Sequence, residues 1–370
     1  TRRRRPEEPE RRPAPQRRRR NKRSPLSNSM LYIVMVCAVS IVLAAVGWSL
    51  ANDMLALNKD KVTATIVVDD ENDFGSVVDQ LKDNDIIKYK GLFRLFSALS
   101  GGSDKIAQGS YLVDTDMDYR AILNSLGSGS SSRVEVSVTI QEGLTVRQIF
   151  ELLEKEGVST VEKLNDMAAN HDYAFSFLED IPLGDPNRLE GYLFPDTYNF
   201  YMGEDPKYVI NKMLVNFDSK VDDSMRQKIA DKGYTIQELL TVASMIEKET
   251  DGEDRGKIAS VIYNRLNNPG ASAGTNGYLQ IDATLAYLNG GKVPTEADKS
   301  IDSPYNTYLY PGLPPGPIAN PGLESIKAAM EPESTSYYYY TLGDDNKHHF
   351  FNTYGEMTSF MSTQALYSGG

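Results

Sequence analysis

The sequence predicts an α+β protein that begins with a single membrane-spanning helix. An uncharged apolar segment near the N-terminus is long enough to cross a bilayer, and strand and helix patterns alternate along the rest of the chain. The only cysteine, Cys37, lies inside the apolar segment, so the remainder has to fold around hydrophobic cores without disulfides. The length of 370 residues suggests two or three domains.

The first 24 residues form a basic arm. They carry twelve Arg or Lys and three Glu, a net charge of +9, whereas the whole chain carries −12. Prolines interrupt the arm and it lacks large apolar side chains, so we expect residues 1–29 to be disordered. A nucleic-acid tail is the competing interpretation, but we expect no nucleic acid as a partner because a membrane segment follows directly. Residue 1 is Thr, so we expect the natural start upstream.

Residues 30–50 are the predicted transmembrane helix. No charged residue occurs between Arg23 and Asp53, and these 21 residues match a hydrocarbon core about 30 Å thick. A cleaved signal peptide is the alternative, although its apolar region would be shorter and would end at a small-residue cleavage site. The cations before the span place the N-terminus in the cytoplasm and the bulk of the chain outside, with the lipid bilayer as a partner.

Residues 51–61 are expected to be a tether, and residues 62–133 to form a first subdomain. Its periodicities predict strands at 61–68 and 109–113, and helices at 73–81, 92–99 and 118–126. The Gly-Ser run at 127–132 predicts a flexible connector, because it lacks the Lys-Ser/Thr ending of a phosphate-binding loop.

Residues 134–230 are expected to form a strand-helix and helical connecting region. A strand is predicted within 131–143 and an amphipathic helix at 145–157, followed by mainly helical chain to about 233 with a Pro-rich loop at 181–187. Three helices share a loose pattern, which hints at repeated strand–helix units. Residues 231–370 should form a further α+β domain, with a Tyr-rich strand at 337–342.

Two carboxylates, Glu247 and Glu249, end an apolar helical run that starts near Ile236. At 100° per residue they lie on opposite edges of the apolar stripe. A carboxyl group beside apolar packing holds its proton more tightly than one in water, which is what a general acid needs. Solvated residues at a helix C-terminus are the alternative, and helix geometry does not separate the two glutamates.

Several classes of enzyme are disfavoured by what the chain lacks. The exterior has three His, no Cys and no HExxH motif, so we expect no metal centre and no cofactor. No Ser-x-x-Lys motif of a penicillin-binding transpeptidase occurs, and no Gly-x-Ser-x-Gly elbow occurs outside the Gly-Ser run.

The polar composition of the C-terminal half suits carbohydrate. Tyr rings stack on sugar faces, while amide, hydroxyl and carboxylate groups bind sugar hydroxyls directionally. A structural role in an α+β core is the alternative for each single residue. The candidate substrate-binding residues are Glu190, Tyr192, Asp196, Tyr198, Glu249, Asn264, Gln280, Asp282, Thr284, Tyr305, Asn306, Thr307 and Tyr308.

Several segments, in this order, resemble the endolytic murein transglycosylases, the YceG-like or MltG proteins. They are EGYLFPDTY at 190–198, VASMIEKET at 242–250, VIYNRL at 261–266, LQIDATLAY at 279–287, YNTY at 305–308 and GLPPGPIANPG at 312–322. The resemblance implies that residues 231–370 form the catalytic transglycosylase domain and that Glu247 is the catalytic acid/base. It also implies a LysM-like subdomain at 62–133 that holds glycan; a plain spacer that lifts the catalytic domain off the membrane is the alternative.

The activity that the resemblance implies is that of a lytic transglycosylase, a lyase of the bacterial cell membrane. It would cleave the bond between N-acetylmuramic acid and N-acetylglucosamine in nascent peptidoglycan, leaving 1,6-anhydro ends. Peptidoglycan strands would be the substrate, and peptidoglycan synthases with divisome or elongasome proteins the protein partners. Asp282 or Glu190 would position sugar or stabilise oxocarbenium charge. The rival interpretation is a non-catalytic wall-binding scaffold for synthases.

The chain departs from the family pattern at three points. Ala283 stands where relatives often have Pro, and residues 267–277 form a longer loop. Glu356 is followed by Met357, where many members have Glu-His, so a C-terminal histidine role does not carry over. None of these departures touches Glu247.

Overall fold

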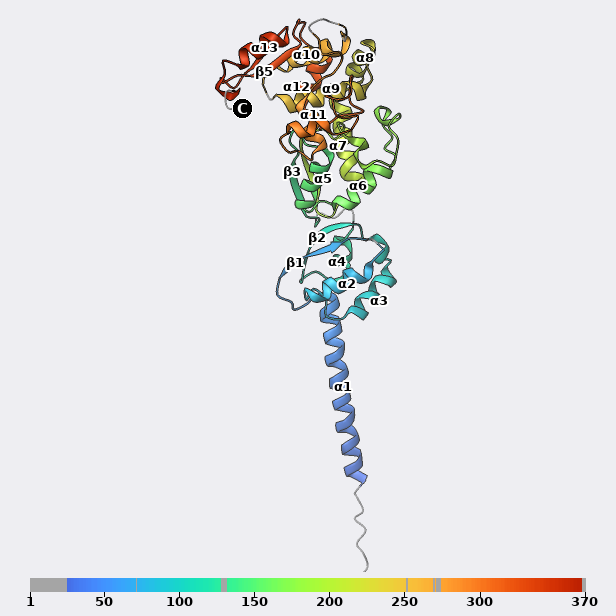
Figure 1. The fold of residues 1–370 in the computed structure, drawn as a ribbon. Helices are drawn as coiled ribbons and strands as arrows, with labels where there is room; N and C mark the ends of the chain where they lie inside the picture. Colours follow the sequence, from blue (N-terminus) through green and yellow to red (C-terminus); the bar gives the residue numbers. More distant parts are fainter. Residues whose placement is uncertain are drawn as a thin grey trace, which may run out of the picture.

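The structure is a computed structural model that describes residues 25–70, 72–127, 132–250, 252–268, 270 and 274–367. The basic arm and most of the Gly-Ser run lie outside these ranges. Figure 1 shows a long helix, α1 (Pro25–Leu55), that leads into a small lobe, with a larger lobe beyond it. Residues 29–55 of α1 are the one segment among the described helices that is long and apolar enough to cross a membrane.

The C-terminal end of α1 packs against the small lobe through Asp53. This side chain is 1% exposed and accepts hydrogen bonds from the backbone N–H groups of Lys88 and Tyr89. It also accepts one from the Tyr119 hydroxyl at 2.6 Å and forms an ion pair with Lys59 at 3.0 Å. Residues 51–55, within the expected tether, are therefore the last turn of a helix that is joined to the lobe.

The small lobe contains the predicted strands and helices, with bounds within two residues of those expected. β1 (Thr63–Val68) pairs antiparallel with β2 (Gly109–Asp114), and side chains from both strands enter the core. The helices are α2 (Phe74–Asp83), α3 (Lys90–Ser100), η1 (Ser103–Lys105) and α4 (Tyr119–Ser125). Ile66, Val78, Phe93 and Ile122 are fully buried there, so this lobe has a hydrophobic core of its own.

The large lobe begins with β3 (Glu135–Thr139) and α5 (Val146–Lys155), a strand followed by a helix, as β1 is followed by α2 and β2 by α4 in the small lobe. The middle part contains α6 (Val161–Asn170), η2 (Ser176–Leu178), η3 (Pro186–Leu189), β4 (Thr197–Tyr201), α7 (Pro206–Lys220) and α8 (Asp223–Asp231). The last part contains α9 (Ile236–Glu249), α10 (Arg255–Asn267), α11 (Asp282–Leu288), η4 (Glu296–Ser300), α12 (Leu323–Met330), β5 (Tyr339–Leu342), β6 (His348–Phe351), α13 (Tyr354–Met361) and η5 (Ala365–Tyr367).

Strand β4 lies in a region that the sequence predicted as mainly helical. Its five residues alternate between buried Tyr198 and Phe200 and exposed Thr197 and Asn199, and the strand pairs antiparallel with β3. So short a strand produces little periodicity of its own, and pairing with distant β3 stabilises it. The predicted strand at 131–143 is correspondingly shorter, because its ladder extends only from Glu135 to Thr139.

One hydrophobic cluster joins the described elements of the large lobe from Val138 to Met330. α9 lies within it, and both α10 and α12 pack against α9. The hairpin β5–β6 adds Tyr340 and Phe350 to the periphery of this core. The core therefore fixes the C-terminal end of α9, where the candidate acid lies.

Candidate active site

Glu247 lies where α9 leaves the core. The helix begins with a capping box between Thr235 and Glu238, and every residue from Leu239 to Ile246 is buried. Glu247 is the first partly exposed side chain after that run, and the chain becomes extended at Thr250. The packing of α9 therefore holds this carboxylate at a fixed place on the edge of the core.

The carboxylate of Glu247 accepts a hydrogen bond from the backbone N–H of Gly322, with 3.0 Å between N and Oε2. Gly322 is the N-cap of α12, and a helix N-terminus favours a nearby negative charge. A Cβ atom on Gly322 would overlap the carboxylate of Glu142. Glu142 and Glu247 therefore approach Gly322 together, and only glycine leaves room for both.

Glu142 is a site residue that the sequence did not reveal. Burial, and next the charge of Glu247, raise the pKa of Glu142 above its ordinary value. It lies at the end of the predicted strand range 131–143, in the sequence Gln-Glu-Gly, where no periodicity distinguishes it from a surface residue. The contact with Gly322, 180 positions away in the chain, is what brings it to the site.

A cleft of about 740 Å³ opens beside Glu247. It lies between the end of α9, the start of α10 and the β5–β6 hairpin. Its polar side chains carry both charge signs, and the hairpin contributes His348 and Phe350. The other charged lining residues are Lys248, Glu249, Glu253, Asp254, Lys257 and Lys347.

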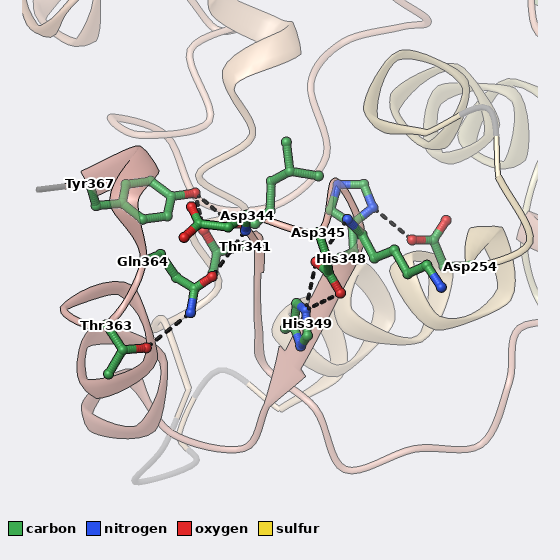
Figure 2. Close-up of polar contacts among 11 residues, drawn as sticks. Asp254, Thr341, Asp344, Asp345, His348, His349, Thr363, Gln364 and Tyr367 are labelled. Carbon is green, nitrogen blue, oxygen red and sulfur yellow. Dashed lines mark hydrogen bonds and ion pairs between the residues drawn. The ribbon is translucent and has the colours of Figure 1, made fainter.

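Asp254 and His348 form a pair on the wall of this cleft (Figure 2). Oδ2 of Asp254 lies 2.6 Å from Nδ1 of His348, and Oδ1 accepts a hydrogen bond from the Thr250 hydroxyl at 2.6 Å. Although burial opposes it, these hydrogen bonds hold the pKa of Asp254 below its ordinary value. Asp254 is thus a carboxylate that orients the imidazole.

Glu249 connects this cleft to a second cavity of about 700 Å³. Its Oε2 accepts a hydrogen bond from the Tyr340 hydroxyl at 2.9 Å, and burial raises the pKa of Glu249. The second cavity also contains Gln280, Asp282 and Tyr308. The structure therefore brings four of the predicted substrate-binding residues together.

Polar and aromatic groups shape the second cavity. The Tyr308 hydroxyl donates to Oδ1 of Asp282 at 2.6 Å. Arg265, which is 6% exposed, donates from Nε to the Tyr338 carbonyl at 2.7 Å and lies over the rings of Tyr339 and Tyr340. Such walls can stack against a sugar ring and bind its hydroxyls. Arg265 lies in the segment VIYNRL, but the sequence does not indicate it as a site residue, because its burial depends on contacts with the β5–β6 hairpin.

Five further predicted residues are absent from the described lining of this cavity and make structural contacts instead. Thr307 accepts from the Ile281 backbone N–H at 3.0 Å and pairs with Thr284 at 3.0 Å, so both fix the start of α11. Asn264 donates to the carbonyls of Thr335 and Tyr337. The two remaining residues are Asn306, bonded to the carbonyls of Lys299 and Ile301, and Tyr305, packed on Tyr287.

The four predicted residues of the 190–198 motif lie in the lobe's interior or at β4, and the described linings of the two cavities contain none of them. Tyr192 is 1% exposed, and the Tyr198 hydroxyl donates to the Phe194 carbonyl. Asp196 accepts from Asn216 at 3.0 Å. The hydrogen bonds that Asn216 of α7 donates to Asp196 and Tyr198 stabilise the junction between β4 and α7.

Glu190 is buried next to Asn320. Its Oε1 accepts from the Val146 backbone N–H and from Nδ2 of Asn320, both at 3.0 Å. The Oδ1 atom of Asn320 accepts from the N–H groups of Gly191 at 3.0 Å and Leu193 at 2.9 Å. Asn320 therefore ties the 190–198 motif to the loop that carries Gly322.

Glu190 also predicts a pH dependence of stability. Burial raises the pKa of Glu190 to about 8, whereas an unfolded glutamate titrates near 4.3. The folded state therefore holds more protons between these values, and stability falls as pH rises through that window. Glu190→Gln keeps an acceptor for Val146 and cannot ionise. We expect the free energy of unfolding of this variant to exceed that of wild type by about 5 kcal/mol at pH 8 and to equal it at pH 4.

Urea denaturation of the full chain in detergent, at pH 4 and pH 8, measures this difference. A wild-type stability that stays constant between the two pH values would contradict a buried, protonated Glu190.

Comparisons with known proteins show which family the chain belongs to. Residues 66–362 match the model of the YceG-like family. The chain belongs to the YceG-like family. This YceG-like chain is 32% identical over 308 residues to the endolytic murein transglycosylase of Bacillus subtilis strain 168, a match that covers 80% of the chain and 83% of the relative. The resemblance inferred from the motifs is thereby confirmed.

Two further relatives support the same family. The endolytic murein transglycosylase of Streptococcus pneumoniae D39 is 30% identical over 275 residues, which cover 69% of this YceG-like chain and 50% of the pneumococcal protein. A 2.6 Å crystal structure of a yceG-like protein from Listeria monocytogenes superposes with a TM-score of 0.53 at 27% identity. That superposition covers 81% of the chain and 99% of the Listeria chain.

Proposed function

We propose that this YceG-like protein is a membrane-anchored endolytic lytic transglycosylase of nascent peptidoglycan. Its curated relatives carry the name endolytic murein transglycosylase. The observation that supports the chemistry is Glu247, held at the edge of the core by α9 and facing a cleft of about 740 Å³. The adjoining cavity, with Gln280, Asp282 and Tyr308, is the proposed sugar-binding extension.

Glu247 is proposed to act first as acid and then as base. Its carboxyl group protonates the glycosidic oxygen between N-acetylmuramic acid and N-acetylglucosamine, and the bond from that oxygen to muramic C1 breaks. The carboxylate then takes the proton of the muramic C6 hydroxyl as the C6 oxygen forms a bond to C1. The acceptor belongs to the substrate, so no water is consumed and the attack is intramolecular.

Asp282 is the better placed of the two residues considered for stabilising the developing positive charge. It lies in the cavity that shares Glu249 with the cleft, whereas the Glu190 carboxyl is 4% exposed and bonded to Val146 and Asn320. The carboxylate of Asp282 is also held by Tyr308. We assign the sugar-positioning role to Asp282.

The small lobe is proposed to be the LysM-like subdomain. The antiparallel pair β1–β2 with helices α2, α3 and α4 forms a small β/α module around its own core. Its position between α1 and the large lobe would place a glycan-holding module on the membrane side of the cleft (Figure 1). Peptidoglycan synthases and divisome or elongasome proteins are the proposed protein partners.

The proposed topology has α1 spanning the membrane with the N-terminus in the cytoplasm. We expect protease added to intact cells to degrade the chain after Ala51 and to spare the basic arm. Immunoblotting with one tag before α1 and another after Gly370 measures this. Protection of the C-terminal tag would overturn the orientation.

The proposed intramolecular mechanism predicts which products form. Full-length protein in detergent should convert uncrosslinked glycan to anhydromuramic ends in the presence of EDTA. In ¹⁸O-water these ends should contain no isotope, because the C6 oxygen and not water attacks C1. Mass spectrometry measures both results.

Isotope at the new muramic C1 would instead indicate a hydrolase with a second carboxylate. Glu142 would then be the first residue to test, because it reaches the same glycine as Glu247.

A further inference from the structure

We propose that His348 is a substrate-binding residue whose Nε2 accepts a hydrogen bond from a hydroxyl of the sugar held beside Glu247. This inference rests on the proposed function. Both side chains line the same cleft of about 740 Å³, Glu247 from the end of α9 and His348 from the first residue of β6.

The imidazole of His348 is held in one orientation. Its side chain is 15% exposed, and its ring packs edge-on against Tyr340 with 5.6 Å between centroids. Nδ1 lies 2.6 Å from Asp254, whose other carboxylate oxygen is occupied by the Thr250 hydroxyl. One packed ring and one fixed carboxylate therefore leave the imidazole little freedom.

The tautomer follows from this arrangement. An ionised Asp254 only accepts hydrogen bonds, so Nδ1 carries the hydrogen and donates it. In the neutral imidazole Nε2 then presents a lone pair, and within the described part of the chain this atom has no hydrogen-bond partner. A group that is mostly buried, oriented and unpaired on a cleft wall is suited to receive a sugar hydroxyl.

His349, the next residue, provides a matched control. It also pairs with an aspartate, at 3.1 Å from Nε2 to Asp345, but it does not line the cleft and is 37% exposed. Figure 2 shows His348 directed toward Asp254 and His349 directed toward Asp345. Substitution of His349 therefore removes an Asp–His pair from the same strand without altering the cleft wall.

Two substitutions separate the proposed contact of Nε2 with substrate from the contact of Nδ1 with Asp254. His348→Asn places an amide N–H where Nδ1 was, so it keeps the bond to Asp254 but has no atom at the Nε2 position. His348→Gln reaches the Nε2 position with an amide oxygen and loses the bond to Asp254. Binding of uncrosslinked glycan strands is measured with full-length protein in detergent that also carries Glu247→Gln, so that the strands stay intact.

We expect His348→Asn to weaken glycan binding about tenfold and His348→Gln to weaken it less, with His349→Asn equal to the parent. In protein that retains Glu247, His348→Asn should lower kcat/KM by at least the same factor. Glycan affinity equal to the parent in the Asn variant would overturn the proposal, because only the contact with Asp254 would then matter.

A measurement without substitution of the histidine covers the case in which a variant does not fold. The chain has three His, so ¹⁵N spectra of the imidazoles are simple. Adding glycan to the Glu247→Gln protein should shift the Nε2 signal of His348 and leave His349 unchanged. An unchanged His348 signal at saturating glycan would contradict the inference. If wild type and the His349 variant both fail to cleave glycan, the proposed function itself fails instead.

Discussion

Replacing Glu247 by Gln will reduce glycan cleavage at least about 10³-fold while the fold is retained. Gln has the shape of Glu and can still accept the hydrogen bond from Gly322, so packing at the end of α9 should not change. It cannot protonate a glycosidic oxygen or take up the C6 proton. Release of anhydromuramic ends by the full chain in detergent measures the loss, and the melting temperature checks the fold.

Glu249→Gln is the matched control, two residues further along the same helix. Its carboxylate accepts from Tyr340 and lies between the cleft and the second cavity, so we expect a loss of about tenfold or less. Equal losses in the two variants would contradict the assignment of Glu247. Retained turnover in Glu247→Gln would contradict it as well.

Replacing Asn320 by Ala will destabilise the large lobe by about 4 kcal/mol and abolish cleavage. Asn320 is fully buried, and its amide group bonds to Gly191, Leu193, Leu144 and Glu190. Alanine leaves the backbone N–H groups of Gly191 and Leu193 without a partner and removes one of the hydrogen bonds to the buried carboxyl of Glu190. The loop that positions Gly322 then loses its side-chain link to residues 191–193, and we expect its hydrogen bond to Glu247 to weaken.

Urea denaturation and hydrogen exchange of residues 190–193 measure the Asn320 effect. Asn170→Ala is the control, because Asn170 is exposed and its amide donates one hydrogen bond, to Asp166 at 2.8 Å. We expect that control to change stability by less than about 0.5 kcal/mol. A similarly small change in Asn320→Ala would show that the loop is held by other contacts.

The local elements of this protein are largely determined by periodicity. The helix at 118–126 is predicted by the spacing of Tyr119, Ile122 and Leu126, and the structure has α4 at Tyr119–Ser125 with those side chains buried. The same holds for α9, whose apolar run and capping box are both local features. Strand β4 was missed because its stability comes from β3, about sixty positions earlier.

The candidate site shows the same division. The sequence identifies Glu247 as the catalytic acid only through the family resemblance, because helix geometry makes Glu249 an equally good candidate. Glu142 and the Asp254–His348 pair were not predicted at all. Each depends on chain segments that meet only after folding, Gly322 with Glu142 and β6 with the start of α10.

The sequence by itself determined the apolar N-terminal helix, the alternating small-lobe elements, the family and the helix whose last turn carries Glu247. The tertiary structure alone decided which polar residues face a cavity and which are buried supports. Gln280, Asp282 and Tyr308 line a cavity, whereas Glu190, Tyr192 and Thr284 are buried in the lobe. The physical reason is that amino-acid type fixes what a side chain can bond to, while burial and partners depend on contacts between residues far apart in the chain.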